Sequence, residues 1–360
     1  MLSNRLLRKT NPTKFARFFW QESKFAEDSV PGIFKEAKAR NEWLDCVRFD
    51  GQSFNWTTKE FDMYSSAFAY GLLEQGFKSG DKLMLWVDSE YSAEIAVAQV
   101  GAMKWGISIV TSDHKDEVHH IGDALDHSGA SGLLLSPHTK LDGKTQRANL
   151  LMDLVPELAD AYPGQRIEFS NFPNLRSVMH TAHTTIRGTS KFKENMLYTK
   201  KSLTNLRMEG SEAENLAMEC YSQGDKVASL TNGDLIKKAK QIWKSHLNGD
   251  DKTLPVFLTL SLQYPLGFAT FLSSVMNGRK VFIPSTYNIA KITKSFNFQK
   301  SDVLVCEDEV FGFEPPMHKF DEVKENTSYF KKVIVAGSGD STESSIFSDI
   351  DATHADLYLQ

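Results

Sequence analysis

Histidine and aspartate side chains gather in one stretch of this sequence, a combination that could bind a metal ion. His119 and Asp123 are four residues apart, so they would share one face of the helix expected over residues 114–128. Imidazole nitrogen and carboxylate oxygen are both zinc ligands. A solvated polar helix face is the commoner meaning of such a pattern, so we predict no metal site in this group, which comprises His114, Asp116, His119, His120, Asp123, Asp126 and His127.

Two further groups of polar residues stand near the ends of expected strands. His180 and His183 could bind a metal at a strand end, although a surface or loop role is commoner. Glu307, Asp308 and Glu309 follow another expected strand, the place where α/β proteins present ligands. An acidic rim is the commoner outcome there, so we predict no metal ligand in either group.

The remaining candidates are a glycine pair and a basic stretch. Gly337-Ser338-Gly339 follows a strand but lacks the third glycine of a dinucleotide-binding loop. A stretch of lysines with one tyrosine could contact anionic lipid or RNA, although a solvated connector is the default; it comprises Lys191, Lys193, Tyr198, Lys200 and Lys201. The sequence also has no serine-nucleophile elbow, Walker loop, zinc-protease motif or paired cysteine motif. We therefore predict no catalytic residue, although an α/β metalloenzyme that uses the histidine-rich helix stays open as an alternative.

Composition indicates an ordinary globular protein with a sizeable core. The chain has 360 residues, of which 41% are hydrophobic and 24% charged. Its net charge of −5 gives no general reason to expect nucleic-acid binding. The three cysteines, Cys46, Cys220 and Cys306, are far apart and have no metal-ligand spacing, which favours a reducing compartment.

Residues 54–113 predict the fold. A stripe of apolar and small residues with helical period begins after Thr57 or Thr58, either of which could cap the helix. Gly76 and Gly80-Asp81 end it, and residues 82–87 form a short apolar run typical of a strand covered on both faces. A second helix over residues 91–105 and a strand over 106–110 follow. This alternation predicts a parallel α/β sheet.

The rest of the chain continues the alternation, with a hairpin turn expected at Asp50-Gly51, helices over residues 288–298 and 342–349, and short strands over residues 177–180 and 355–359. Two stretches are exceptions. Residues 140–165 are expected to be helical, and residues 181–214 show little periodicity and read as a connector. Residues 253–278 carry no charge and are long enough to span a bilayer, but Gln263 and Pro265 favour a buried strand, a turn and a buried helix. We predict a doubly wound, mostly parallel α/β fold with two stacked subdomains, residues 21–190 and 215–360, joined by a connector over residues 191–214.

Residues 1–20 differ from the rest of the chain. They carry five basic residues and no acidic one, interleaved with leucine and phenylalanine; the basic residues are Arg5, Arg8, Lys9, Lys14 and Arg17. Such a start is typical of a mitochondrial targeting segment, and a basic surface arm is the alternative. We expect either a targeting segment or an arm that a partner orders.

Several segments together resemble the adenylate-forming, AMP-binding superfamily of acyl-CoA synthetases and luciferases. The resemblance spans about residue 53 to the end and keeps the family's order of motifs. These motifs are Trp56-Thr57, the turn at 76–81, the glycine–lysine–glycine segment at 101–106, the strand at 173–178, the strand–turn–helix–glycine–strand section at 253–284 and the glycine-rich turn at 332–339. The resemblance implies the doubly wound sheets already predicted from periodicity.

The family's phosphate-binding loop should fall on residues 218–227, just before the helix start at 230–235. Glycines of that loop let backbone amides approach the phosphates of ATP. The three glycine positions here hold Cys220, Gln223 and Val227, whose side chains would block that approach. Glu219 and Asp225 would also repel a triphosphate. The resemblance therefore leaves a degenerate remnant with no expected cofactor binding, whose matching residues are Ser222, Gly224, Lys226 and Thr231.

The family's magnesium-binding motif, ribose-binding aspartate and small C-terminal domain with its catalytic lysine would all follow residue 360. We therefore expect that C-terminal domain to be absent and the chain to be a non-catalytic scaffold or accessory subunit. Its expected host is a mitochondrial inner-membrane complex, a respiratory-chain or ATP-synthase assembly. We expect a position on the matrix side, protein subunits as partners, no nucleic acid, and membrane contact only through those partners. The alternative is a residual acyl- or nucleotide-binding protein, or half of a split adenylate-forming ligase.

Overall fold

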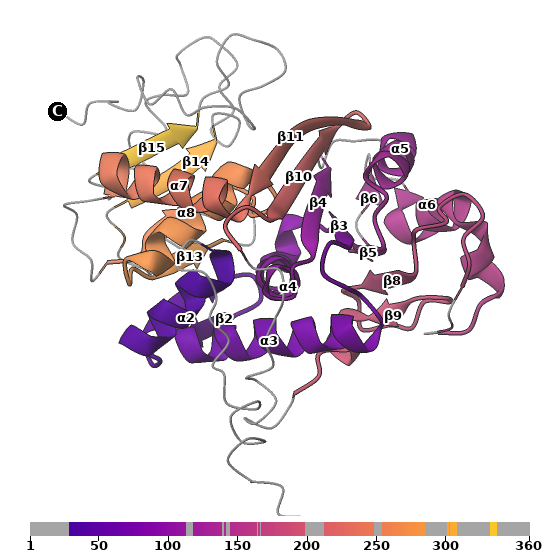
Figure 1. Cartoon of the computed structure of the whole chain (residues 1–360), viewed down its shortest axis with the longest axis horizontal. Coiled ribbons are helices and arrows are strands. Elements are labelled where there is room, and N and C mark those ends of the chain that lie inside the picture. Colours follow the sequence, from indigo (N-terminus) through magenta and orange to yellow (C-terminus); the bar gives the residue numbers. More distant parts are fainter. Residues whose placement is uncertain are drawn as a thin grey trace, which may run out of the picture.

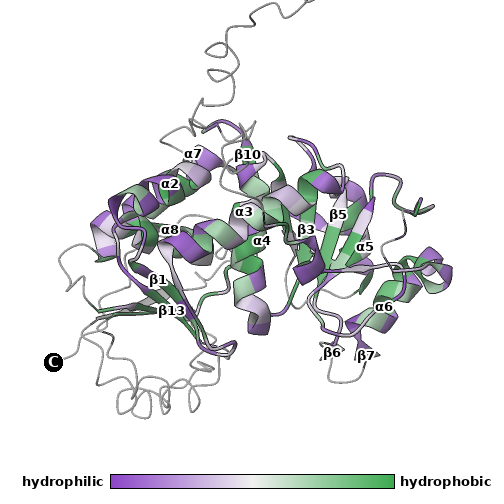
Figure 2. Ribbon diagram, turned by 90° about the horizontal axis from the view of Figure 1, so that it is seen from below, coloured by the Kyte–Doolittle hydropathy of each residue, from purple (hydrophilic) through white to green (hydrophobic). Residues whose placement is uncertain are grey.

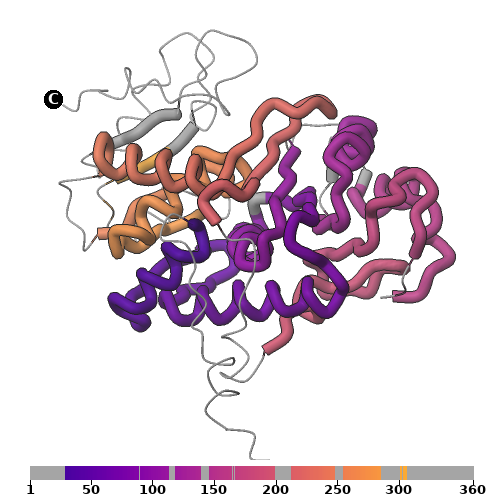
Figure 3. The backbone as a smooth tube through the Cα atoms, in the orientation of Figure 1, coloured from indigo at the N-terminus to yellow at the C-terminus, as the bar shows by residue number. Residues whose placement is uncertain are grey.

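The structure of this chain is a computed structural model (Figure 1). It describes residues 29–112, 118–138, 140–141, 145–163, 165, 167–198, 212–247, 254–284, 301, 303–307 and 332–336 (Figure 1). Figure 3 traces the course of the backbone in the same orientation. The basic segment 1–20, the helices predicted at 288–298 and 342–349, and the strand predicted at 355–359 lie outside these residues.

Seven strands form the first sheet, in the order β11-β10-β4-β3-β5-β8-β9. All neighbouring pairs are parallel except β10 and β11, which form an antiparallel hairpin. The strands are β3 (Lys82–Trp86), β4 (Ser108–Ser112), β5 (Gly132–Leu135), β8 (Ser177–His180), β9 (Ser190–Lys191), β10 (Leu216–Ser222) and β11 (Asp225–Thr231).

Six strands form the second sheet, in the order β15-β14-β12-β13-β1-β2. It is parallel except for the β1–β2 hairpin, whose tip carries the predicted turn at Asp50-Gly51. The strands are β1 (Asp45–Phe49), β2 (Phe54–Thr57), β12 (Val256–Leu258), β13 (Val281–Ile283), β14 (Val303–Glu307) and β15 (Lys332–Ala336).

Helices cover both faces of the first sheet. One face packs on α3 (Thr58–Glu74) and α4 (Ser92–Lys104), in a core that continues to the second sheet and to α2 (Val30–Arg40), α7 (Asn232–Ile242) and α8 (Pro265–Met276). The other face packs on α5 (Val118–Ser128) and α6 (Arg147–Leu154). Figure 2 shows apolar residues along the inner sides of these elements. The predicted α/β fold with mostly parallel sheets is confirmed.

Sheet membership does not coincide with the division at residues 191–214. The hairpin β10–β11 follows the connector but completes the first sheet, where β10 pairs with β4. Conversely, β1 and β2 precede the first sheet in sequence but extend the second, where β1 pairs with β13. The two sheets are therefore built from interleaved segments, because parallel pairing joins strands that lie far apart in sequence.

Thr57 begins α3 as predicted. Its hydroxyl accepts a hydrogen bond from the Glu60 backbone N–H, and the Glu60 carboxylate accepts one from the Thr57 backbone N–H. This reciprocal capping box satisfies two amides that the first turn would leave without partners. The sequence signal for this helix start was therefore local and sufficient.

A glycine permits close packing between α3 and α4. A Cβ atom added at Gly101 would lie 2.7 Å from the Ser65 backbone oxygen of α3. Three residues later, Lys104 is 2% exposed and inserts its ammonium group between the same two helices. The segment at 101–106 that resembles the family motif thus has a packing role in this chain.

Replacing Gly101 by alanine is expected to lower the free energy of unfolding by about 1–3 kcal/mol, because the backbones of α3 and α4 must separate. Gly122→Ala on α5 is the matched control, since its new Cβ would meet only the flexible Leu154 side chain, at 2.9 Å. We expect the control to be near neutral, because alanine also favours the helix by about 1 kcal/mol. Urea unfolding of both variants measures the difference, and equal losses would contradict the packing role of Gly101.

Two predictions about irregular segments need correction. Residues 140–165 are not one helix: a small hairpin of β6 (Lys140–Leu141) and β7 (Thr145–Gln146) comes first, then α6, then a 3-10 turn at Pro156–Asp160. The connector predicted from residue 181 contains β9 and a 3-10 turn at Phe192–Asn195. That turn packs on α3, since the Phe192 ring stacks on the Phe68 ring with the two centroids 4.7 Å apart. Single buried aromatics such as Phe192 carry no periodic signal, so the sequence could not reveal this contact.

The uncharged stretch at 253–278 folds as a buried pair. From residue 254 onward it contains β12, a turn and α8, and most of the α8 side chains are buried. None of the helices in the described ranges combines the length and apolar character needed to cross a bilayer. The strand–turn–helix prediction for this stretch is confirmed.

Candidate functional site

The position of the family's phosphate loop is occupied by the hairpin β10–β11. Ser222 pairs with Asp225, so only Gln223 and Gly224 form the turn between the strands. Both have positive φ, 52° and 84°, as a tight two-residue hairpin turn requires. Eight of the ten loop positions therefore lie within paired strands, and their backbone amides are arranged for the ladder and not for a phosphate cradle.

The lysine that matches the family position is held by an ion pair inside the hairpin. Lys226 Nζ lies 2.9 Å from Glu219 Oε1, and Lys82 Nζ of β3 lies 2.7 Å from Glu219 Oε2. Burial alone would raise the pKa of Glu219, which is 4% exposed, but hydrogen bonds and charge from Lys82 and Lys226 bring this pKa below its usual value. Glu219 is thus an anion that neutralises the lysine at this position.

The histidine-rich helix supports this hairpin. His127 Nδ1 lies 2.9 Å from the Gly224 carbonyl oxygen, which places the protonated form of that nitrogen in position to donate. A Cβ atom at Gly224 would meet the Asp123 Cβ atom at 2.8 Å, so a glycine is needed for this approach as well as for the turn. His119 and His120 have ring centroids 4.0 Å apart. The described part of the chain contains no cluster of three His, Cys, Asp or Glu residues able to hold a metal.

The other two residues of the phosphate-loop remnant, Thr231 and Ser222, have structural roles. The Thr231 hydroxyl caps α7 by accepting from the Asp234 N–H, and the Asp234 carboxylate accepts from the Thr231 N–H. Ser222 ends β10 beside the turn. Ser222, Gly224 and Lys226 are brought together by the hairpin, whereas Thr231 stands at the far end of β11.

Glutamine side chains connect the two sheets near the carboxyl ends of their strands. Gln263, in the turn after β12, donates to the Val87 carbonyl after β3 at 2.6 Å. Gln99 of α4 donates to the Leu262 carbonyl at 2.6 Å. Gln52, at the β1–β2 tip, accepts from the Ala93 N–H and donates to the Glu94 carboxylate. In α/β folds, ligands bind outside the carboxyl ends of the strands; here hydrogen bonds of three glutamines join elements of the two sheets in that region.

These glutamines had no signal in the sequence. Each partner lies far away in the chain, as with Gln263 and Val87, which are 176 positions apart. A lone glutamine has no motif spacing, so only the tertiary structure could show its role. Burial raises the pKa of the neighbouring Glu94, which the Gln52 hydrogen bond partly offsets.

His180 lies at the carboxyl end of β8 and is buried, whereas His183 is exposed. Neither ring nitrogen of His180 has a hydrogen-bond partner in the described structure. Arg147 of α6 contacts the neighbouring strands. Its guanidinium is 5.3 Å from the centroid of the Trp86 ring, and it donates to the Trp86 carbonyl and the Ser136 hydroxyl. Trp86, Leu135 and His180 form one row across the sheet. His180 is thus a buried residue at the carboxyl end of β8, between β5 and β9.

The remaining candidates fall into two sets. Lys191 pairs with Glu194 at 3.2 Å, and Tyr198 is exposed and contacts the Tyr64 ring edge to face, at 6.4 Å. Glu307 ends β14. The rest lie outside the described residues: His114, Asp116, Lys200, Lys201, Asp308, Glu309, Gly337, Ser338 and Gly339.

Comparison with known proteins covers most of the chain. The sequence profile "AMP-binding enzyme" matches residues 34–301. Among solved structures, similarity extends to a luciferase-like enzyme from the nonluminescent mealworm Zophobas morio, with a TM-score of 0.66, 12% identity, and coverage of 88% of this chain and 74% of that one. No curated protein matches the sequence significantly.

Two bacterial ligases are similar at the same level. Unliganded O-succinylbenzoate coenzyme A synthetase from Bacillus subtilis gives a TM-score of 0.62 at 14% identity, covering 87% of this chain and 55% of that one. A mutant of coronafacic acid ligase from Pectobacterium brasiliense gives 0.64 at 14% identity, covering 85% and 55%. This chain thus spans about half the length of these ligases. Since the family profile matches more than half of its residues, the chain belongs to the AMP-binding, adenylate-forming enzyme family.

Proposed function

We propose that this protein is a non-catalytic member of its family that serves as a scaffold or accessory subunit. The observation that carries the proposal is the closed hairpin at residues 218–227, with Lys226 neutralised by Glu219. An adenylate-forming reaction needs groups that stabilise the triphosphate charge, and a lysine already paired with a buried carboxylate offers little to it. The glutamine bridges across the carboxyl ends of the sheets support the same reading.

The proposed host is a complex of the mitochondrial inner membrane, a respiratory-chain or ATP-synthase assembly, reached from the matrix side. The basic, acid-free residues 1–20 support a mitochondrial location. Protein subunits would be the partners, and the membrane contact would be indirect. Native-mass separation of detergent-solubilised mitochondria tests this proposal: the protein should co-migrate with a high-mass assembly, and a free monomer with no high-mass fraction would refute it.

Loss of nucleotide binding is a separate expectation. Calorimetry with ATP and with a fatty acyl-CoA should show no saturable heat at concentrations up to about 1 mM. Glu219→Gln is the matched variant, because it removes the charge that holds Lys226 and Lys82. If the hairpin were a latent cradle, this variant would gain ATP affinity; we expect it to gain none, since the backbone amides of the hairpin remain paired.

Micromolar binding of ATP or acyl-CoA would instead favour the second candidate. In that case the chain would be a residual acyl- or nucleotide-binding protein, or half of a split ligase completed by another chain. The observation behind it is that the chain spans 55% of the similar coenzyme A ligases. Calorimetry therefore decides between the two candidates independently of the native-mass experiment.

A further inference from the structure

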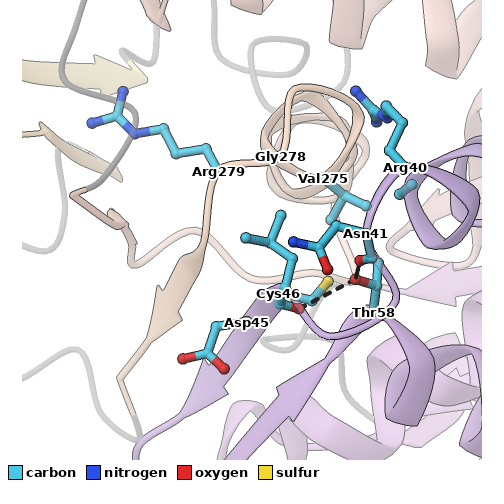
Figure 4. A pocket seen from close by; sticks show the side chains of 10 residues that line it. Arg40, Asn41, Asp45, Cys46, Thr58, Val275, Gly278 and Arg279 are labelled. Atoms are coloured by element: carbon cyan, nitrogen blue, oxygen red, sulfur yellow. Dashed lines mark hydrogen bonds between the residues drawn. The ribbon is translucent and has the colours of Figure 1, made fainter.

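A hollow opens at the corner where α2, α3 and α8 meet the start of β1 (Figure 4). Its volume is 90 Å³, and its wall combines aliphatic side chains with one thiol and three charged residues. Ala37, Leu44 and Val275 supply the aliphatic part, Cys46 supplies the thiol, and the charged residues are Arg40, Arg279 and Asp45. The hollow is far from the hairpin at residues 218–227, since none of its lining residues belongs to the first sheet.

The wall of the hollow is held in place by its own hydrogen bonds. The Thr58 hydroxyl donates to the carbonyl oxygens of Asn41 and Leu44, at 2.8 and 3.2 Å. The Asn41 side-chain oxygen accepts from the Trp43 backbone N–H at 3.1 Å. The loop between α2 and β1 is therefore preorganised, and these polar groups need no ligand.

Cys46 does not make the hollow a reactive site. Burial raises the pKa of its thiol to about 12, and the neighbouring Asp45 carboxylate acts in the same direction. The thiolate is the nucleophile and the metal ligand, so a thiol that stays neutral behaves as a small apolar group. Cys46 thus extends the aliphatic surface of the hollow.

Large apolar side chains stand exposed beside this hollow. Trp43 is 67% exposed, and Met63 is 45% exposed. Lys59 joins them: its ammonium lies 3.9 Å from the centroid of the Trp43 ring, and it is four residues from Met63 on α3. We call Arg40, Trp43, Lys59, Met63 and the hollow the Trp43 corner.

The charge of the Trp43 corner is positive at its rim, because the Asp45 carboxylate that also lines the hollow is paired with Lys280 at 2.8 Å. Arg40 lies on the exposed side of the last turn of α2, and no carboxylate within the described ranges forms an ion pair with it. Lys59 forms an ion pair with Glu42, with Nζ 3.2 Å from Oε1, and both side chains are about two-fifths exposed. Tryptophan and arginine are the residue types most enriched among energetic hot spots of protein interfaces.

We propose that the Trp43 corner docks a segment of a partner protein that inserts one aliphatic side chain into the hollow and sets a carboxylate against Arg40. An aliphatic side chain fits better than an aromatic ring, because 90 Å³ is below the roughly 150 Å³ of a cavity that admits benzene. A small free carboxylate would leave Trp43 and Met63 uncovered. Residues 1–20 of this chain carry five cations and no anion, so their charge repels them from Arg40.

This inference rests on the proposed accessory-subunit role and names its docking surface. The test expresses full-length variants in place of the native protein and measures the share that co-migrates with the high-mass assembly. Arg40→Glu and Trp43→Ser change the corner. Lys78→Glu and Tyr162→Ser are matched controls, since Lys78 is an exposed lysine and Tyr162 is 79% exposed, both outside the corner. Thermal melts of all four proteins check that they fold.

We expect each corner variant to lower the assembled share at least tenfold, with both controls unchanged. If the native protein assembles and the corner variants assemble equally well, the docking surface is refuted while the accessory-subunit role stands. If the native protein itself is a free monomer, both proposals fall.

Zero-length carbodiimide cross-linking of the isolated assembly supplies a second readout. It joins a lysine ammonium to a carboxylate in direct contact, so Lys59 should become linked to an acidic residue of a different protein. Lys78 should not. A link from Lys59 to a second copy of this chain, or no link to any other chain, would overturn the proposed partner.

Discussion

Replacing Asp62 by alanine is expected to lower the free energy of unfolding by about 3–5 kcal/mol, because it leaves the Lys104 ammonium buried without a counter-charge. Lys104 is 2% exposed, and its Nζ lies 2.6 Å from Asp62 Oδ1. The same ammonium donates to the Asp62 carbonyl and to the hydroxyls of Ser65 and Ser66, at 2.8–3.0 Å. Those neutral acceptors remain in the variant, but none carries a negative charge.

The protonation of this pair supports the expected size of the effect. Burial lowers the pKa of Lys104, and Asp62 opposes that shift. Burial would raise the pKa of Asp62, but its ion pairs with Lys104 and Lys38 hold it below its usual value. Asp62 therefore stays ionised at neutral pH, and its charge stabilises a cation that would otherwise be costly to bury.

A double-mutant cycle in urea separates the pair from its parts. Lys104→Met combined with Asp62→Ala should lower the free energy of unfolding much less than Asp62→Ala alone, since the double variant removes the buried cation together with its counter-charge. Asp45→Ala is the matched control, because Asp45 pairs with Lys280 at 2.8 Å but is 47% exposed, and we expect a loss of only about 0–1 kcal/mol. A loss for Asp62→Ala as small as that of the control would show that Lys104 needs no counter-charge.

His180 is expected to make the protein less stable as the pH falls from about 6.5 toward 4. Burial is the largest cause that lowers its pKa, to about 4 from an ordinary 6.5, and the nearby Lys191 and His138 act in the same direction while Glu194 opposes them. Between these pH values the unfolded chain binds a proton on His180 and the folded chain does not. Stability from this residue is thus complete above about pH 6.5, and its loss at lower pH is on the order of 2–3 kcal/mol.

His180→Leu removes this titration while keeping an apolar side chain at the buried position. Its unfolding free energy, measured in urea at about pH 7 and about pH 5, should change less with pH than that of the native protein. His183→Leu is the control, since His183 is exposed, and it should keep the native pH profile. Parallel pH profiles for the native protein and His180→Leu would contradict the prediction. Acidic residues that titrate at low pH affect all three proteins alike, so the comparison isolates His180.

Elements with a local cause could be predicted from the sequence. The start of α3 at Thr57, the strand at 82–86 and the short strand at 177–180 all follow from capping residues or from runs of apolar side chains. The region at 140–165 could not be predicted, since a two-residue strand pair such as β6–β7 has too few residues to show a period. The interleaving of the two sheets also had no local cause, because parallel pairing depends on contacts between distant segments.

The candidate site divides in the same way. The sequence of residues 218–227 already predicts that no phosphate cradle forms, since Cys220, Gln223 and Val227 replace the glycines that a cradle needs. The pairing of Glu219 with both Lys226 and Lys82 required the strand register, which places β10 between β11 and β4 and brings β3 within reach. The structural role of the histidine-rich helix likewise follows from the tertiary contact between His127 and the Gly224 carbonyl.

The fold class, the family and the loss of the loop glycines can be inferred from residue types and from their spacing along the chain. Where charge and apolar surface gather depends instead on contacts in the folded protein: the buried Lys104–Asp62 pair, the glutamine bridges between the sheets and the Trp43 corner. Each of these joins residues from separate elements, such as Gln263 and Val87. Burial and pairing are properties of neighbours in space, so no pattern along the chain could contain them.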